Sequence, residues 1–372
     1  MRGLIIWATT NCRSTMGLYR EIQKQLGVPV CIALYVYSEG CQRLDKGYRI
    51  GEFDDVETVY VGEDFGKGCE LMNSCRGYNH IFTMFQRAPN FCNLILEASR
   101  RGERVAVAAE SPCNMSHASL MRWIVKEMYN RFYLPVYSRR IVKACDFFVN
   151  YSGSSKKEAL SIGWKDSQFH AFGYFPPPLE GSHVVERVSN RNFHVLATGV
   201  LSRYRGADVL VDALHILSQK GIRYHATITQ RGPIRDEIVR KAKVHSLPIS
   251  FPGFVKMDEL ISLYENCSVY VGAGRSEPWG MRLNDALNCG APLAVSRGMG
   301  GVQMVDQYKC GGAFSAGNSE ELANLLEKMA TDNNYYASCA KSAVNAVQRI
   351  SPENKAAEFI EILASAGKEW RR

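Results

Sequence analysis

The sequence lacks the features that mark membrane-spanning, secreted and zinc-binding proteins. No run of about 18 apolar residues occurs, so no segment is predicted to cross a bilayer as a helix. Residues 1–10 contain a short apolar run without a cleavage-site pattern, which indicates a first strand rather than a signal peptide. The 12 cysteines include no Cys-x-x-Cys pair, which indicates reduced thiols and argues against zinc. We therefore expect a cytoplasmic protein.

Length and composition describe a globular protein of two domains. The chain has 372 residues, of which 46% are hydrophobic and 22% are charged. The 45 Lys and Arg residues outnumber the 37 Asp and Glu residues, which gives a formal net charge of +8. This surplus favours an anionic partner such as a nucleotide, a phospholipid surface or a nucleic acid. Because no nucleic-acid recognition motif is present, we expect no nucleic-acid partner.

One stretch in the second half combines a buried strand, a glycine-rich loop, a helix and a second strand. The strands are predicted over residues 269–272 and 292–296, and the helix over residues 281–288. Glu277 in the loop and Asp285 in the helix are predicted to face the carboxyl end of the sheet. Open parallel sheets bind their ligands at that edge, so we expect a binding pocket there.

This stretch resembles the donor site of retaining glycosyltransferases of family 4, which have the GT-B fold and carry two glutamates around a Phe-Gly-Leu-like turn. Glu277 matches the first glutamate, Trp279-Gly280-Met281 matches the turn, and Asp285 replaces the second glutamate. The resemblance implies that Glu277 binds hydroxyls of the transferred sugar, that N–H groups of the turn bind the diphosphate, and that Asp285 binds the ribose. The alternative is that Glu277 only caps the helix and Asp285 is a solvated helix residue.

A second loop resembles the Gly-Arg-x-x-x-x-Lys-Gly loop of the same family, whose two basic side chains neutralise the donor diphosphate. Gly199, Arg205 and Gly206 match this pattern, whereas Val200 replaces the first basic residue. We expect Arg205 to stabilise the leaving diphosphate and Arg203 to supply the missing charge. The alternative is that both arginines are solvated surface residues.

Further motifs of the family follow along the chain. Residues 249–255 resemble the strand and loop that meet the nucleotide base, and in the glycine-rich loop at 298–301 the usual glutamate is replaced by Met304. The donor-binding residues implied by the resemblance are Gly199, Arg203, Arg205, Gly253, Phe254, Glu277, Pro278, Trp279, Gly280, Met281 and Asp285. The resemblance covers residues 193–350 by motifs and the first half only by the order of its strands and helices.

In the first half, three residues are candidates for the acceptor side. Arg13 lies in a predicted loop at residues 11–17, before a helix at 18–26, and Glu110 follows a predicted central strand at residues 104–109. His117 lies at the head of the next helix. Glu110 is also a candidate catalytic residue. The alternatives are that Arg13 is a surface residue, that Glu110 pairs with a neighbouring basic residue, and that His117 is structural or solvated.

The domain boundary is predicted at the three consecutive prolines 176–178, which cannot belong to a central strand. We expect an acceptor-binding Rossmann-like domain over residues 1–175, a linker over 176–192, a donor-binding Rossmann-like domain over 193–350, and a final helix within 351–372. In the family, that helix crosses back onto the first domain. The predicted fold class is therefore α/β with two Rossmann-like domains of the GT-B type and a cleft between them.

Residues 117–143 combine basic and aromatic side chains. Six Lys or Arg residues stand against the single acid Glu127. Such a segment can lie on an anionic membrane surface, which would make the protein peripheral on the inner face of the cytoplasmic membrane. The alternative is an amphipathic helix packed on its own domain.

The resemblance implies a hexosyltransferase that moves a sugar with retention from a UDP- or GDP-linked donor to a glycan hydroxyl. The expected acceptor is lipid-linked, in the assembly of a polysaccharide such as O-antigen or capsule. We expect no cofactor and no metal, in agreement with the absence of an Asp-x-Asp motif. The alternative, suggested by Val200, Asp285 and Met304, is a non-catalytic GT-B subunit of a polysaccharide synthase complex.

Overall fold

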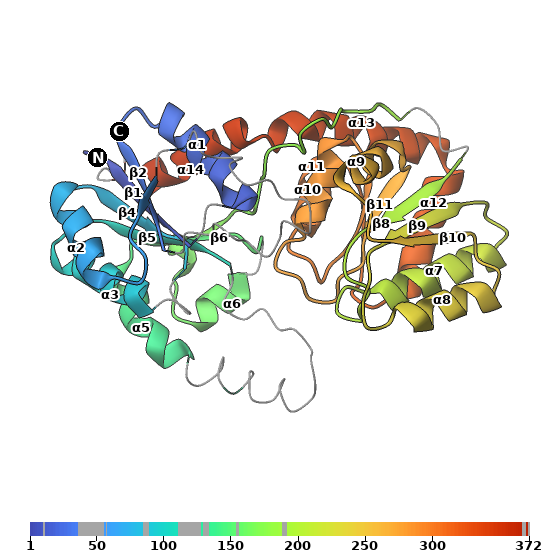
Figure 1. Ribbon diagram of the computed structural model, residues 1–372, viewed down its shortest axis with the longest axis horizontal. Coiled ribbons are helices and arrows are strands. Elements are labelled where there is room, and N and C mark those ends of the chain that lie inside the picture. The colour runs from blue at the N-terminus through green and yellow to red at the C-terminus, as the bar shows by residue number, and fades with distance from the viewer. Residues whose placement is uncertain are drawn as a thin grey trace. The chain divides into compact units, whose positions relative to one another are not determined.

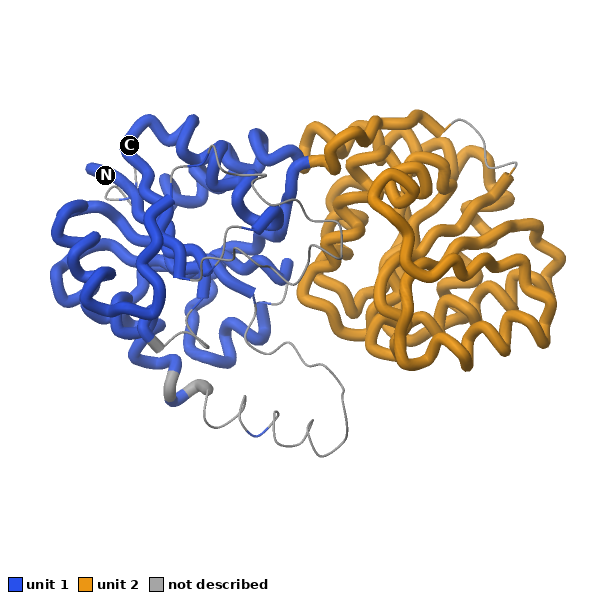
Figure 2. The backbone as a smooth tube through the Cα atoms, in the orientation of Figure 1, with its two compact units in different colours: residues 1–177, 351–372 blue, residues 178–350 orange. Residues whose placement is uncertain are grey.

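The chain forms two compact units, which are described separately. The computed structural model describes residues 1–9, 12–35, 56, 58–84, 89–110, 128, 134–153, 156–187, 192–366 and 370. Unit 1 consists of Met1–Pro177 and Ser351–Arg372, and unit 2 consists of Pro178–Ile350 (Figure 2). The chain therefore leaves unit 1 between two prolines and returns to it just before its last helix.

Unit 1 is built on a seven-stranded parallel sheet with the order β3-β2-β1-β4-β5-β6-β7. Its strands are β1 (Leu4–Ala8), β2 (Val30–Leu34), β3 (Thr58–Tyr60), β4 (Asn79–Phe82), β5 (Val105–Ala109), β6 (Phe147–Asn150) and β7 (Phe169–Ala171). Every residue of β1 and β5 is buried. Such uninterrupted apolar strands are typical of parallel sheets covered on both faces.

Helices cover both faces of this sheet (Figure 1). They are α1 (Arg13–Gln25), α2 (Phe65–Ser74), α3 (Pro89–Arg100), α5 (Leu134–Ala144), α6 (Lys156–Ser161) and α14 (Pro352–Ser365). The last helix packs against α1, and Phe359 of α14 meets Phe172 with ring centroids 5.5 Å apart. The C-terminal helix is thus part of the core of unit 1.

Helix α1 begins earlier than the sequence predicts. The loop expected at residues 11–17 is helical from Arg13 onward, where the carbonyl of Cys12 accepts hydrogen bonds from the N–H groups of Thr15 and Met16. The Sγ of Cys12 also lies 2.9 Å from the hydroxyl of Ser14. The first turn of α1 is therefore held by backbone hydrogen bonds to Cys12, although its polar composition suggests a loop.

Unit 2 is built on a six-stranded parallel sheet with the order β10-β9-β8-β11-β12-β13. Its strands are β8 (His194–Ala197), β9 (His225–Thr229), β10 (Ile249–Gly253), β11 (Val269–Gly272), β12 (Leu293–Ser296) and β13 (Gly311–Phe314). Its helices are α7 (Ala207–Gln219), α8 (Arg235–Val244), α9 (Met257–Asn266), α10 (Met281–Asn288), α11 (Val302–Tyr308), α12 (Ser319–Thr331) and α13 (Asn333–Arg349). Figure 1 shows α7 and α8 on one face and α9, α10 and α11 on the other.

The final helices of the chain begin at short polar side chains that cap them. Asn318 accepts hydrogen bonds from the N–H groups of Glu320 and Glu321 at the start of α12, both at 3.1 Å. Asp332 caps α13 in the same way, and Ser351 caps α14, whose first residue is Pro352. Such caps satisfy N–H groups that have no acceptor inside the helix.

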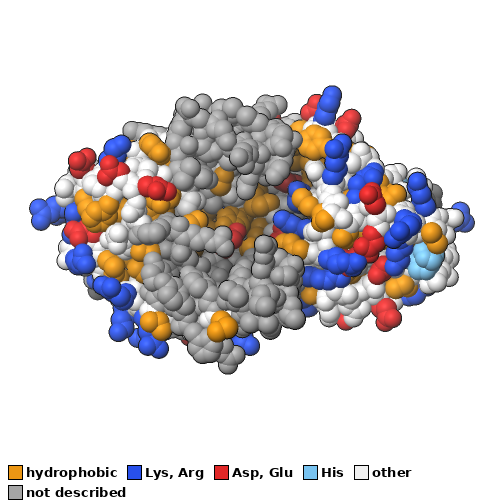
Figure 3. Space-filling view, turned by 60° about the horizontal axis from the view of Figure 1, so that its bottom comes forward, with side chains coloured by type: hydrophobic (Ala, Val, Ile, Leu, Met, Phe, Trp, Pro, Cys, Tyr) orange, Lys and Arg blue, Asp and Glu red, His pale blue; other side chains and the backbone are white. Residues whose placement is uncertain are grey.

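The α/β fold class predicted from the sequence is confirmed by these two parallel sheets with alternating helices. Within the described ranges, no helix has the length and apolarity needed to cross a membrane. The ten cysteines in those ranges are free. Figure 3 shows many Lys and Arg side chains on the face of unit 2 that it displays.

Candidate active site

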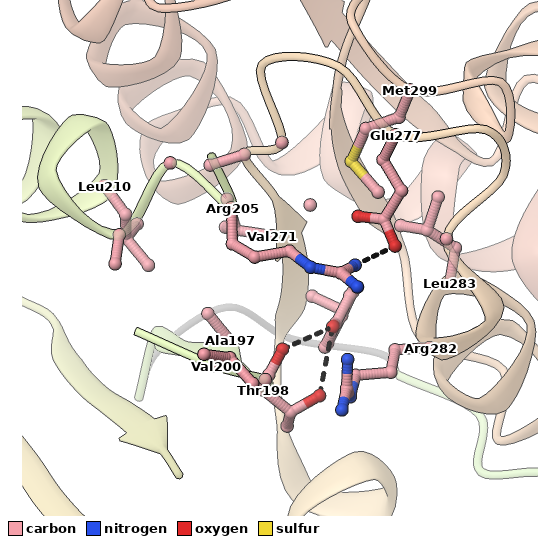
Figure 4. A pocket seen from close by; sticks show the side chains of 18 of the residues that line it. Ala197, Thr198, Val200, Arg205, Leu210, Val271, Glu277, Arg282, Leu283 and Met299 are labelled. Carbon is pink, nitrogen blue, oxygen red and sulfur yellow. Dashed lines mark hydrogen bonds and ion pairs between the residues drawn. The ribbon is translucent and has the colours of Figure 1, made fainter. Parts of the chain in front are cut away.

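A pocket opens in unit 2 at the carboxyl edge of the sheet, where β8 and β11 lie side by side. The strand order reverses between these two strands, since β9 and β10 continue from β8 and β12 and β13 continue from β11. Loops that leave a sheet at such a reversal diverge and form the usual ligand crevice of open α/β sheets. The pocket is lined by Ala197, Thr198, Gly199, Val200, Leu201, Arg205, Gly206, Ala207, Leu210, Ile228, Tyr270, Val271, Gly272, Ala273, Gly274, Glu277, Gly280, Arg282, Leu283 and Met299 (Figure 4).

Glu277 and Arg205 meet inside this pocket. The guanidinium of Arg205 donates to the Glu277 carboxylate, and the side chain of Glu277 is only 12% exposed. The backbone of Glu277 is fixed on both sides, because its N–H donates to the carbonyl of Gly298 at 2.8 Å and its carbonyl accepts from Gly300 at 3.0 Å. The alternative that Glu277 caps α10 is wrong, since Gly280 occupies the N-cap position.

The turn before α10 brings a helix start to the pocket. Trp279 is 2% exposed, and its indole N–H donates to the side-chain carbonyl of Asn284 at 2.8 Å. Gly280 has a φ of +100°, and a Cβ at this position would lie 2.4 Å from the Cε of Met299. Only glycine fits here, and no side chain caps the helix. The first N–H groups of α10 are therefore suited to an anion that enters the pocket.

Arg282, in the first turn of α10, is a pocket residue that the sequence analysis missed. Its guanidinium extends toward the loop after β8 and lies near that of Arg205 (Figure 4). Burial lowers the pKa of Arg205, and the charge of Arg282 lowers it further. The only sequence signal was the position of Arg282 directly after the Trp279-Gly280-Met281 turn.

A group of hydroxyls lies at the base of the pocket. The Oγ1 of Thr198 is 3.1 Å from the hydroxyl of Tyr264 and 3.1 Å from that of Tyr270. Burial raises the pKa of Tyr264 well above its usual value, and the neighbouring Tyr270 and Asp285 raise it further. Both phenols therefore stay neutral and act as hydrogen-bonding groups that fix Thr198 beside Gly199.

Arg203 is not among the residues that line the pocket. Its side chain is 61% exposed and forms ion pairs with Glu237 at 2.7 Å and Asp208 at 3.2 Å. These acids stand at the starts of α8 and α7, respectively, and draw the guanidinium away from the pocket. The expectation that Arg203 replaces the missing basic residue is therefore not supported by its position.

Other predicted donor residues do not line the pocket. Gly253 ends β10, the edge strand, and Phe254 after it is 47% exposed. Asp285 lies one turn into α10 and is half-buried. Pro278 and Met281 flank the buried Trp279 and the N-cap Gly280 and are also absent from the lining. The structure thus brings together Gly199, Arg205, Glu277 and Gly280 of the predicted set.

In unit 1, Glu110 directly follows β5 and is exposed, and it lies next to the half-buried Tyr174. Burial raises the pKa of Tyr174, and the Glu110 charge adds to this effect. Arg13 is 6% exposed in the first turn of α1, where its guanidinium donates to the carbonyl of Pro177. The alternative that Arg13 is a surface residue is therefore wrong. His117 lies outside the described residues.

Part of the predicted basic-aromatic segment is described. In α5, Ile141 and Val142 are buried, while Arg139, Arg140 and Lys143 are exposed. Val136 on the same helix is 65% exposed. One face of this helix is thus packed on unit 1, and the other is basic and open. Residues 117–127 and 129–133 of the segment lie outside the described residues.

Comparison with known proteins matches the second half of the chain to a family of enzymes. Residues 182–346 match the family model described as Glycosyl transferases group 1. Over 100 residues, the chain is 35% identical to the GDP-mannose-dependent alpha-(1-6)-phosphatidylinositol dimannoside mannosyltransferase of Mycobacterium tuberculosis (strain ATCC 25177 / H37Ra). This match covers 27% of the present chain and 26% of that protein. The chain thus spans about a quarter of the length of the curated relatives that it matches.

Solved structures resemble the whole chain. Anabaena HepE in complex with UDP and glucose has a TM-score of 0.66 at 16% identity, over 98% of this chain and 100% of that one. The lipopolysaccharide outer core galactosyltransferase WaaB, in its apo form, has a TM-score of 0.67 at 9% identity, over 98% and 99% of the two chains. At these identities the likeness shows the fold. The predicted GT-B fold is therefore confirmed, and the family match supports a GT-B glycosyltransferase.

Proposed function

We propose that this protein is a retaining glycosyltransferase of family 4 that transfers a hexose from a nucleoside-diphosphate sugar to a hydroxyl of a glycan. The pair of Glu277 and Arg205 in the pocket of unit 2 carries this proposal. A carboxylate accepts hydrogen bonds from sugar hydroxyls, and a guanidinium binds phosphate oxygens in a bidentate geometry. In the structure these two groups pair with each other; in the proposal, each turns to its own part of the bound donor.

The chemistry proposed for the pocket is electrostatic stabilisation of the leaving diphosphate. Charge develops on the diphosphate as the bond to the sugar breaks, and in this proposal Arg205 and the first N–H groups of α10 stabilise it. Their support is that Arg205 lines the pocket and that α10 begins beside it, at the lining residue Gly280. Glu277 would hold the sugar so that its anomeric carbon faces the acceptor. The acceptor hydroxyl loses its proton to the departing phosphate, so the proposal requires neither a protein base nor a metal ion.

For the acceptor, we propose a lipid-linked glycan at the cytoplasmic face of a membrane, as in the assembly of a surface polysaccharide. The names of the mycobacterial mannosyltransferase and of WaaB refer to a phosphatidylinositol dimannoside and to lipopolysaccharide. The exposed basic face of α5 supports the proposal, because Lys and Arg near an anionic lipid surface attract the protein to it. Unit 1, with Glu110 at the end of β5, would bind the acceptor.

The experiment is a transfer assay with the purified chain, UDP- and GDP-linked hexoses and a set of lipid-linked and soluble oligosaccharide acceptors. We expect nucleotide release that depends on the acceptor and a product whose anomeric configuration matches that of the donor. Binding of the donor without turnover on any acceptor would favour the non-catalytic subunit. If neither UDP nor GDP bound in calorimetry, the assignment of the pocket would be wrong.

A further inference from the structure

Arg282 reaches from the start of α10 to the loop that follows β8. A Cβ built at Gly199 would lie 2.8 Å from Nη1 and 3.2 Å from Cζ of Arg282, so the guanidinium rests directly on the backbone of this loop. Gly199 has a φ of +122°, which favours glycine, and its missing side chain leaves the room that the guanidinium occupies. Figure 4 shows Arg282 beside Thr198, with its guanidinium in the same pocket as that of Arg205.

No acid of the described chain pairs with Arg282. Other arginines of unit 2 have carboxylate partners, such as Arg275 with Asp208 at 2.8 Å and Arg297 with Asp306 at 3.2 Å. Across the described residues, the guanidinium of Arg282 has neither a hydrogen bond nor an ion pair. A half-buried guanidinium with five N–H donors loses water contacts that an anionic ligand would replace.

The charge of the pocket is positive. Among the described residues that line it, the charged side chains are Arg205, Arg282 and Glu277. The single carboxylate already accepts from Arg205, which leaves the charge of Arg282 without a counter-charge in the pocket. Two guanidinium groups held near each other repel. A ligand with two or three negative charges attracts both groups, and this attraction outweighs their repulsion.

We propose that Arg282 binds the diphosphate of the donor together with Arg205, from the opposite side of the pocket. The proposal rests on the proposed function. It also explains how the pocket works with Val200 in its lining, at the position where the sequence resemblance leads one to expect a basic side chain. The second cation of the site then comes from α10 rather than from the loop after β8, and Gly199 is required because Arg282 lies over it.

The test is the affinity of Arg282→Met for UDP and GDP, measured by calorimetry against the corresponding nucleosides. Removing a charge-assisted, bidentate contact lowers diphosphate affinity by about 10- to 100-fold. Affinity for uridine or guanosine stays unchanged, because Arg282 does not contact the base in this proposal. Arg282→Lys keeps the charge without the bidentate geometry and is expected to fall between the wild type and Arg282→Met. The binding of inorganic pyrophosphate follows the same order.

The chain offers a matched control and a rescue. Arg240→Met removes an exposed arginine from α8 and leaves diphosphate affinity unchanged. Val200→Arg, introduced into the Arg282→Met variant, returns a guanidinium to the same pocket and restores most of the affinity. Thermal unfolding of each variant verifies that the fold is intact.

Two results would overturn the inference, and they are distinguishable. If Arg205→Met weakened UDP or GDP binding while Arg282→Met bound them as the wild type does, Arg282 would have no role and the proposed function would stand. If the wild type bound neither UDP nor GDP, the proposed function would fail and the inference with it.

Discussion

The guanidinium of Arg205 donates a hydrogen bond to the carboxylate of Glu277, a residue 72 positions later in the chain. The two side chains come from the loops after β8 and β11, adjacent strands at the point where the strand order reverses. Because both groups are partly buried, the ion pair compensates the charge of each. In the proposed function the donor replaces this contact, because its sugar binds Glu277 and its diphosphate binds Arg205.

Glu277→Gln is expected to abolish transfer while leaving nucleoside-diphosphate binding intact or tighter. The substitution removes the carboxylate that orients the sugar, which costs on the order of 100-fold or more in rate. It also frees Arg205 for the phosphate. Rates with the proposed donor and Kd values for UDP and GDP check both effects. Transfer within a few-fold of the wild type would rule out the sugar-binding role.

Arg205→Met is expected to weaken diphosphate binding and to slow transfer together. Arg205 contacts the group on which charge develops, so both the bound ground state and the transition state lose a bidentate contact. We expect a loss of about 10- to 100-fold in affinity and a similar or larger loss in kcat. Steady-state kinetics and calorimetry check this prediction, with Arg240→Met as the surface control. An unchanged Kd for UDP and GDP would remove Arg205 from the diphosphate site.

Trp279→Phe is expected to reduce stability. The indole N–H of Trp279 donates to Asn284, which is 0% exposed, and the smaller ring also leaves space in the core. Together these losses lower the free energy of unfolding by about 1 to 3 kcal/mol. Urea denaturation measures the change, and Phe254→Leu at an exposed position is the control. Equal midpoints for wild type and Trp279→Phe would show that this contact contributes nothing to stability.

Stability is expected to fall in mild acid because of His194 at the start of β8. Burial lowers the pKa of His194 to about 4, and the stacked ring of His225 adds to this effect. Between pH 6.5 and about 4 the unfolded chain binds a proton that the folded chain does not, so the free energy of unfolding decreases as the pH falls.

At pH 5, protonation of His194 in the unfolded chain lowers the free energy of unfolding by about 2 kcal/mol relative to pH 7.5. His194→Asn removes it, so the pH dependence of urea unfolding between these values should become shallower by that amount. His183→Asn, at a histidine whose side chain is 80% exposed, serves as the control. Parallel pH profiles for the wild type and His194→Asn would contradict the prediction.

Binding to anionic vesicles is expected to depend on the exposed face of α5. Each of Arg139, Arg140 and Lys143 contributes about 1 kcal/mol near an anionic surface, and the attraction decays over about 8 Å at physiological salt. Changing all three to Gln should therefore reduce sedimentation with phosphatidylserine vesicles, and high salt should reduce the binding of the wild type.

The matched control for this experiment changes the same number of exposed basic residues in unit 2, Arg223, Arg240 and Lys243, to Gln. It is expected to bind anionic vesicles as the wild type does. If binding did not depend on lipid charge, or if both triple variants lost the same amount of vesicle binding, the membrane role of α5 would be wrong. The helix would then only pack on its own domain.

The elements that sequence analysis predicted best are those whose own residues determine them. β5 is a run of small apolar residues, α10 lies between a glycine turn and Gly290, and α14 begins at a side chain that caps the helix. The elements that the sequence did not predict, or whose ends it predicted wrongly, depend on contacts with distant residues or have few local sequence features that define them. Helix α11 and strand β13 are short and follow a glycine-rich loop, and the start of α1 is polar.

The same distinction separates the site residues. Glu277, Gly280 and Arg205 lie in local motifs, so their place in the pocket could be predicted. Arg203 turns away because Glu237 on α8 pairs with it, and Arg282 enters the pocket because Gly199 leaves room for it. Both contacts join segments that are far apart in the sequence, and no local pattern encodes them.

The position of α14 has a consequence for the order in which the protein folds during synthesis. Unit 2 is one continuous stretch, whereas unit 1 needs residues from both ends of the chain. Until α14 is synthesised, α1 lacks the helix that packs against it, and Phe172 lacks its contact with Phe359. The sheet of unit 1 is therefore synthesised first, but its core is completed only when α14 has been added, after all of unit 2.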